Sequence, residues 1–99
     1  MEKFEKRVRD AIKEMKRLGY TPRLLLQMIG ESNAVAAVKT LLHKKDPPEG
    51  FTRLWEMNRL DLSMENIVCS EDWGDLFTSE EKERAKKRLI DYKFLRENH

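Results

Sequence analysis

The stretch EKFEKRVRDAIKEMKRL, residues 2–18, sets the pattern for the whole chain. Its apolar side chains recur at spacings of three and four, from Phe4 through Ile12 to Leu18, which places them on one face of an α-helix. Gly19 follows, and glycine ends helices because it adopts the left-handed conformation without steric cost. The sequence therefore predicts a first helix over residues 2–18 with one buried face.

Beyond this helix, the same kind of pattern returns in shorter segments. Thr21 can accept hydrogen bonds from the first turn of a second helix, which Gly30 is expected to end. Ser32 or Asn33 opens a third helix over residues 34–42, whose small apolar side chains cover more than half of its circumference. A helix with so wide an apolar face must be packed on several sides, so we expect it at the centre of the fold.

The second half of the chain begins after the linker-like run HKKDPPEG, residues 43–50, in which consecutive prolines forbid a helix. A short helix is expected over residues 52–58, and residues 60–62 are expected to form an extended connector. Ser63 then caps another short helix, and the capping box TSEE at residues 78–81 opens a long terminal one.

Length and composition agree with a single helical domain. No segment alternates apolar and polar residues for long enough to predict a strand. No apolar run approaches the roughly 20 residues of a membrane helix, and the N-terminus lacks the apolar centre of an export signal. We therefore expect an all-α domain over residues 1–99, located in the cytoplasm, with about six or seven helices, the two long terminal ones around shorter ones.

The chain combines four short motifs: GYTP at residues 19–22, GF at 50–51, RLDLSME at 59–65 and WGDLF at 73–77. Taken together, they resemble a pattern found in small bacterial helical proteins of uncharacterised function. The resemblance spans most of the chain, and its most specific part is RLDLSME followed by WGDLF. It implies a cytoplasmic bacterial protein, and it implies no catalytic or ligand-binding residue.

Side chains that bind metals or act as nucleophiles are few and scattered. His43, His99 and Cys69 include no pair at a ligand spacing, so we expect no metal site and no cofactor. Cys69 follows two apolar residues, which predicts a buried and unreactive thiol. His43 ends the third predicted helix, where an imidazolium complements the negative end of the helix dipole, so a structural role is favoured over proton transfer.

Three acids surround Trp73, and they are the strongest candidates for catalysis. Two of Glu71, Asp72 and Asp75 could form an acid–base pair or a divalent-ion site. The favoured interpretation is structural, because acids are common at the start of short helices. We therefore expect a protein without enzymatic activity.

Nucleic-acid binding is the alternative function. On a helical wheel, five cations of the first helix gather opposite its apolar face and form what we call the basic ridge: Lys6, Arg9, Lys13, Lys16 and Arg17. Such a ridge can contact phosphates weakly and in a salt-dependent way. A helix-turn-helix is not favoured, because the third helix offers alanine and valine where groove-reading residues would be needed.

Protein interaction is the favoured function. Five large apolar side chains lie in the half of the chain built from short helices, and we call them the aromatic set: Phe51, Trp55, Met57, Trp73 and Phe77. Short helices hide large rings poorly, and exposed aromatic and methionine side chains are typical anchors for a partner protein or for self-association. The alternative is that these side chains fill a second core.

Overall fold

The computed structural model describes residues 2–95, and every regular element in that range is helical. The α-helices are α1 (Glu2–Arg17), α2 (Arg23–Glu31), α3 (Ala34–Leu42), α4 (Glu49–Glu56), α5 (Met64–Ser70) and α6 (Ser79–Asp91), and the 3₁₀ turns are η1 (Leu60–Leu62) and η2 (Gly74–Leu76). Six α-helices without a strand in residues 2–95 confirm the predicted fold class. The two longest helices, α1 and α6, are the terminal ones, as predicted.

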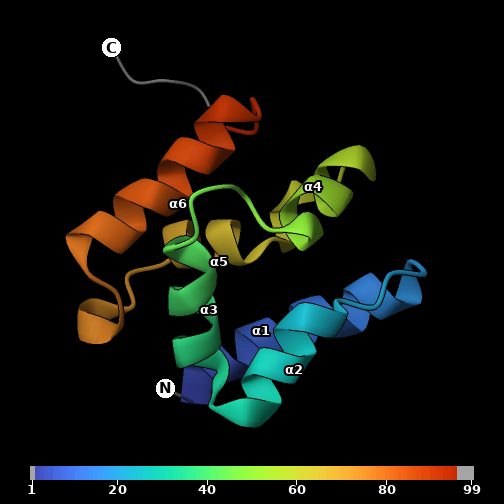
Figure 1. The fold of residues 1–99 in the computed structure, drawn as a ribbon, viewed down its shortest axis with the longest axis horizontal. Coiled ribbons are helices and arrows are strands. Elements are labelled where there is room, and N and C mark those ends of the chain that lie inside the picture. The colour runs from blue at the N-terminus through green and yellow to red at the C-terminus, as the bar shows by residue number, and fades with distance from the viewer. Residues whose placement is uncertain (1, 96–99) are drawn as a thin grey trace.

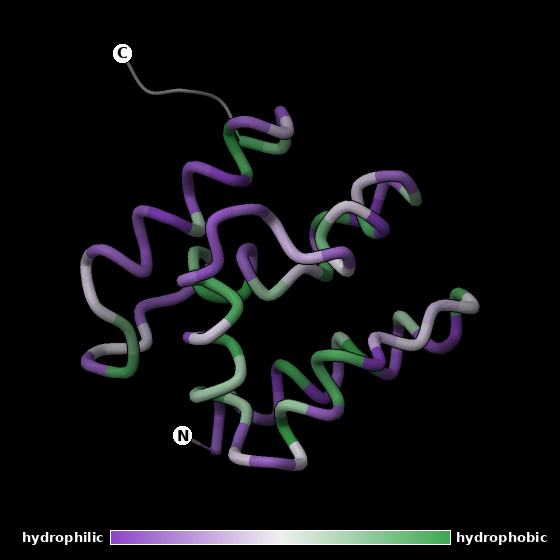
Figure 2. The backbone as a smooth tube through the Cα atoms, in the orientation of Figure 1, coloured by the Kyte–Doolittle hydropathy of each residue, from purple (hydrophilic) through white to green (hydrophobic). Residues whose placement is uncertain are grey.

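The helices are arranged around α3 and α5 (Figure 1). The pair α1 and α2 lies on one side of these two helices, and α6 lies on the other. Figure 2 shows hydrophobic residues along α3, whereas hydrophilic residues dominate α6. Helix α4 lies at a corner of the molecule and is joined to the rest through η1.

The core forms where the predicted apolar faces meet. The buried residues of the two main core helices are Phe4, Val8, Ala11, Ile12 and Met15 on α1, and Ala34, Val35, Ala37, Val38, Leu41 and Leu42 on α3. The central position expected for α3 is therefore confirmed. Within residues 2–95, no helix combines the length and the apolar character that crossing a bilayer requires.

Three predicted helix starts are confirmed by their capping bonds. The side chain of Asn33 accepts a hydrogen bond from the amide of Ala36 at 2.9 Å, and Asn33 is therefore the cap of α3. The hydroxyl of Ser63 caps α5 in the same way. At α6, Thr78 and Glu81 exchange side-chain-to-amide bonds and form the complete capping box. These signals depend on residues three apart, so the sequence alone contains them.

The boundaries of α2 differ from the prediction. Its first residue is Arg23, and Pro22 stands at the cap position, so no side chain caps the helix and the predicted role of Thr21 is wrong. The carbonyl of Thr21 accepts the amide of Arg23 at 2.9 Å instead. Gly30 does not end the helix, because its backbone keeps a negative φ and the helix continues to Glu31.

Residues 60–62 form the turn η1 and not the predicted extended connector. The physical reason lies at Ser63, whose amide and hydroxyl both donate to the carbonyl of Leu60, at 3.0 and 2.7 Å. These two bonds tighten the backbone into one 3₁₀ turn directly before α5. Leu60 is buried as predicted.

Candidate functional site

The structure places most of the aromatic set in the core. Phe51 and Phe77 are buried, at 2% and 3% exposure, so the expectation that short helices leave these rings exposed is wrong. Phe51 nevertheless lines a cavity that opens to solvent, so its role in partner binding stays a prediction. Trp73 is half-buried, and its indole N–H donates to the carbonyl of Ile67 at 2.8 Å. The ring of Phe4 lies 5.1 Å from each of the rings of Trp73 and Phe77, measured between centroids. These three rings attach the segment around η2 to α1.

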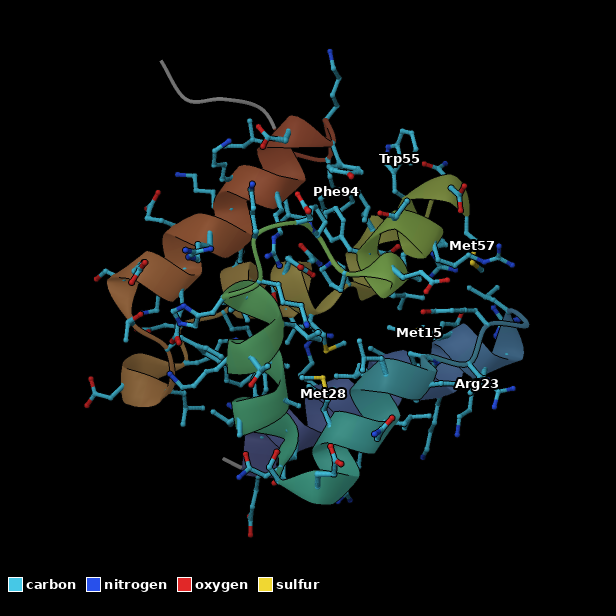
Figure 3. All side chains as sticks on the ribbon, in the orientation of Figure 1. Met15, Arg23, Met28, Trp55, Met57 and Phe94 are labelled. Atoms are coloured by element: carbon cyan, nitrogen blue, oxygen red, sulfur yellow. The ribbon has the colours of Figure 1, made fainter. Side chains whose placement is uncertain are left out.

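Trp55 is the member of the set that lies clearly on the surface. It is 49% exposed, and its ring meets the edge of Tyr92 at 5.4 Å between centroids. Phe94, 41% exposed, lies on the same side of the molecule in Figure 3. Met57 is half-buried just beyond the end of α4. The structure therefore does not bring the five predicted side chains together.

A cavity of about 390 Å³ lies between the α1–α2 turn and α4, and no sequence pattern predicted it. We call it the apolar cavity, because its main wall side chains are Met15, Tyr20, Leu25, Phe51, Leu54 and Met64. Leu24 also lines it and is 50% exposed, which places this leucine at the opening to solvent. The volume falls in the range that binding pockets for small ligands and single anchor side chains occupy.

Tyr20 lines the apolar cavity and reaches from the α1–α2 turn to Gly50 on α4. The turn needs Gly19, whose φ of +92° suits glycine and few other residues. The hydroxyl oxygen of Tyr20 would lie 3.0 Å from a Cβ atom placed on Gly50, so a side chain at that position would push the ring away. Burial raises the pKa of Tyr20, Glu49 adds to the effect, and Arg53 opposes it.

The floor of the apolar cavity contains a buried ion pair. Glu65 lines the cavity, is 2% exposed, and accepts a hydrogen bond from Arg88 at 2.9 Å. Burial raises the pKa of Glu65, and the bond from Arg88 opposes this rise. Arg88 also donates to the carbonyl oxygens of Leu41, Leu42 and Lys44, at 3.0, 3.3 and 2.7 Å. The guanidinium therefore holds the carbonyl end of α3 and the acid of α5 in one rigid unit.

The opening of the apolar cavity carries charged side chains. Arg23, Arg53 and Glu49 line it and are exposed. Among residues 2–95, neither arginine makes an ion pair with an acid of this chain. Figure 3 shows Arg23 at the outer end of the α1–α2 pair. The cavity has apolar walls, a floor whose polar groups are already hydrogen-bonded, and a charged opening. These features make it the best candidate for a binding site.

The basic ridge is present on α1, and all five of its side chains are exposed. Three of them pair with acids of the same helix: Lys6 with Asp10 at 3.1 Å, Arg9 with Glu5 at 3.7 Å, and Arg17 with Glu14 at 2.6 Å. The hydrogen bonds from Arg17 lower the pKa of Glu14 to about 2, so this acid stays ionised beside the ridge. Within residues 2–95, only Lys13 and Lys16 of the five make no such pair. The ridge therefore offers less free positive charge than its sequence suggested.

His43 occupies the C-cap of α3, as predicted, and it also contacts α6. Its Nε2 lies 2.8 Å from one carboxylate oxygen of Glu81, and Lys39 donates to the other at 2.7 Å. Burial raises the pKa of Glu81, but the bonds from Lys39, the Thr78 amide and His43 outweigh it and lower this pKa to about 2. The cluster joins the end of α3 to the start of α6, which is a structural role.

Cys69 is exposed, and the prediction that it is buried is wrong, because the last turn of α5 directs it away from Ile67 and Val68. Partial desolvation and, secondly, the charge of Glu65 raise the pKa of its thiol to about 11. At neutral pH, the thiolate that nucleophilic chemistry needs is therefore scarce.

Two of the three acids near Trp73 make structural contacts. Glu71 lies 3.8 Å from Arg7, and the carboxylate of Asp72 accepts the amide of Gly74 at 2.9 Å. In residues 2–95, no three side chains of histidine, cysteine, aspartate or glutamate come together in a way that could hold a metal ion. His99 lies outside the described residues.

Comparisons with protein-family models, with curated proteins and with solved structures found no match. The resemblance to small bacterial helical proteins therefore stays a prediction, and the function is inferred from the geometry.

Proposed function

We propose that this chain is a protein-interaction module without enzymatic activity, and that it binds an apolar segment of another protein in the apolar cavity. The observation that carries the proposal is the cavity itself. It is a hollow of about 390 Å³ with apolar walls, and the half-exposed Leu24 lies at its opening. An open apolar hollow on a small domain is costly to leave in water, and such surfaces are typical of binding sites.

The construction of the walls supports this reading. Leu25 on α2, Leu54 on α4 and Met64 on α5 come from separate helices, whose backbones hold the walls apart. One leucine or phenylalanine of a partner segment, once buried there, contributes about 1.5–3 kcal/mol to binding. Helical and extended segments both present such anchor side chains to grooves between helices.

The polar groups of the cavity support binding over catalysis. Glu65 is bonded to Arg88, and the hydroxyl of Ser63 donates to the carbonyl of Leu60 at 2.7 Å. Each buried polar side-chain atom among residues 2–95 has a hydrogen-bond partner, so the floor of the cavity is held in place by bonds within the chain. The same groups give a partner segment a rigid floor.

Two other surfaces are less favoured. Trp55 and Phe94 are exposed on another part of the molecule, and they would serve self-association. The basic ridge would serve nucleic-acid binding, but three of its five cations are paired within α1. Each surface predicts a different sensitivity to substitution, and one experiment separates them.

The experiment uses Thr21→Trp, which places an indole in the opening, since Thr21 lines the cavity and is exposed. The matched control is Thr40→Trp, because Thr40 is exposed on α3 and its hydroxyl bonds only to the carbonyl of Ala36 in the same helix. Peptides are selected from a displayed random library on the wild-type protein, and their dissociation constants are measured by fluorescence anisotropy.

We expect Thr21→Trp to weaken binding at least about tenfold, a loss of about 1.4 kcal/mol, and Thr40→Trp to leave it unchanged. Equal affinity for both variants would contradict the proposal. Loss of binding through Trp55→Ala would move the site to the Trp55 surface. Salt-sensitive binding of DNA or RNA that Lys13→Glu with Lys16→Glu abolishes would favour the basic ridge.

A further inference from the structure

The arginines of this chain fall into two groups. Eight lie within residues 2–95, and six of them make ion pairs with acids of the same chain: Arg7, Arg9, Arg17, Arg59, Arg84 and Arg88. The remaining two are Arg23 and Arg53, which form no ion pair with any residue in that range. Both of these arginines line the apolar cavity. Among residues 2–95, arginine without an acid partner is therefore confined to the opening of the candidate binding site.

The charge at this opening is not balanced from within. Glu49 is the exposed acid that lines the cavity, and it stands one helical turn before Arg53 on α4 without forming an ion pair with it. The carboxylate of Glu65 is already bonded to Arg88 in the floor. Two guanidinium groups and one carboxylate therefore face the solvent at the opening, which leaves a net positive charge there.

The start of α2 adds to the positive potential at the opening of the cavity. The helix begins at Arg23 with no capping side chain and no acid in its first turn, and residues 21–25 line the cavity. The positive end of its dipole therefore contributes to the same opening. Arg53 stands across the cavity on α4, so the positive groups lie on two walls.

We propose, on the basis of the proposed function, that the segment bound in the apolar cavity is acidic, with aspartate or glutamate residues on both sides of its apolar anchor. Guanidinium groups bind carboxylates through paired N–H donors, and arginine is suited to such contacts because its donors are held in a planar fork. The apolar anchor fills the cavity, and the flanking carboxylates meet Arg23 and Arg53. The phosphates of a nucleic acid could pair with the two arginines, but a nucleic acid offers no apolar side chain to fill the cavity.

The test uses two displayed peptide libraries that share a random apolar core. One library has glutamate at the positions flanking the core, and the other has lysine. Peptides recovered from each are titrated by fluorescence anisotropy, at low and at high salt, against the wild type and the double variant Arg23→Glu with Arg53→Glu. The charge-matched control is Lys13→Glu with Lys16→Glu on α1, whose side chains do not line the cavity. Thr21→Trp reports whether binding occurs in the cavity.

The wild type is expected to bind glutamate-flanked peptides about five- to tenfold more tightly than lysine-flanked ones at low salt, because exposed ion pairs are individually weak. High salt should reduce this preference, since it screens exposed charges. The Arg23→Glu, Arg53→Glu variant should reverse the preference, and the α1 control should keep it.

Three kinds of result would overturn the inference, and they are distinguishable. In the first, peptides bind equally well whatever their flanking charge, and Thr21→Trp still prevents their binding. This result would leave the proposed function intact and refute the inference that the bound segment is acidic. In the second, Thr21→Trp binds the peptides as tightly as the wild type does, or neither library yields a binding peptide. Either outcome would refute both the proposed function and the acidic partner. Preferential binding of a DNA or RNA oligonucleotide through Arg23 and Arg53, with no peptide bound, would also overturn it.

Discussion

The side of the molecule formed by α3, α5 and α6 differs from the side formed by α4 and the α1–α2 turn. On the first side, two acids are buried and bonded to basic side chains: Glu65 to Arg88, and Glu81 to Lys39 and His43. On the second side, Arg23 and Arg53 lack acid partners among residues 2–95, and Leu24 is half-exposed at the rim of a cavity. The first side stabilises the fold, and the second is left open to a partner.

The largest effect on stability is expected at Arg88, on the side formed by α3, α5 and α6. Arg88→Ala removes the partner of the buried Glu65 and three hydrogen bonds to carbonyl groups at the end of α3. We expect a loss of about 3–5 kcal/mol in the free energy of unfolding, because an unpaired charge is left in the interior. Urea denaturation followed by circular dichroism measures it.

The control for this prediction is Lys87→Ala, on the same helix. Lys87 pairs with Asp91 at 2.9 Å, but its side chain is 75% exposed, so its removal should cost less than about 1 kcal/mol. A similar decrease in the free energy of unfolding in both variants would show that the buried pair stabilises the fold no more than an exposed pair does.

The second effect is pH-dependent and concerns Glu81, whose side chain is 5% exposed. Its pKa in the folded protein, about 2, lies below the usual value of 4.5. The contribution of the ionised carboxylate to the free energy of unfolding is therefore complete above about pH 4.5, and it is lost as the pH falls towards 2. Glu81→Gln should therefore lower stability by about 2–3 kcal/mol at neutral pH and by much less near pH 3.

Denaturation of both proteins across this pH range checks the sign. The comparison with the variant is needed because the raised pKa of Glu65 acts in the opposite direction, by favouring the folded state in acid. A constant difference between wild type and Glu81→Gln at all pH values would refute the role assigned to this carboxylate.

The smallest effect is expected on the outer face of α4. Trp55→Ala should change the free energy of unfolding by less than about 1 kcal/mol, because half of the side chain is already in water and its main ring contact is the edge of Tyr92. Light scattering at high concentration gives the oligomeric state of both proteins. A dimer of the wild type that Trp55→Ala dissociates would shift the interaction surface from the cavity to this face.

The sequence predicted what depends on neighbouring residues. Helix faces repeat at spacings of three and four, and the caps Asn33, Ser63 and Thr78 act on amides three residues away, so these features can be read locally. The fold class follows from them. The helix boundaries failed at Thr21 and Gly30, where proline and a tight turn overrode the favoured capping residue and glycine kept helical dihedrals. They failed also at α4, which begins at Glu49, inside the predicted linker, and ends at Glu56 and not at residue 58.

The candidate site could not be predicted, because it is made by contacts between distant segments. Arg88 is 23 residues away from Glu65 in sequence, and both resemble ordinary charged residues of amphipathic helices. One signal was present, since Arg88 stands three residues after Ala85 and beside Leu89 on the buried face of α6. A charge on an apolar face indicates a buried partner, but not which acid provides it.

NMR of the methyl and amide groups of the protein with a selected peptide tests the central proposal most directly. We predict that the largest chemical-shift changes occur at the methyl groups of Leu24, Leu25 and Leu54, which line the apolar cavity, while those of Ile12 and Val38 in the core of α1 and α3 change little. Changes confined to residues around Trp55, or to amides along the basic ridge of α1, would contradict it.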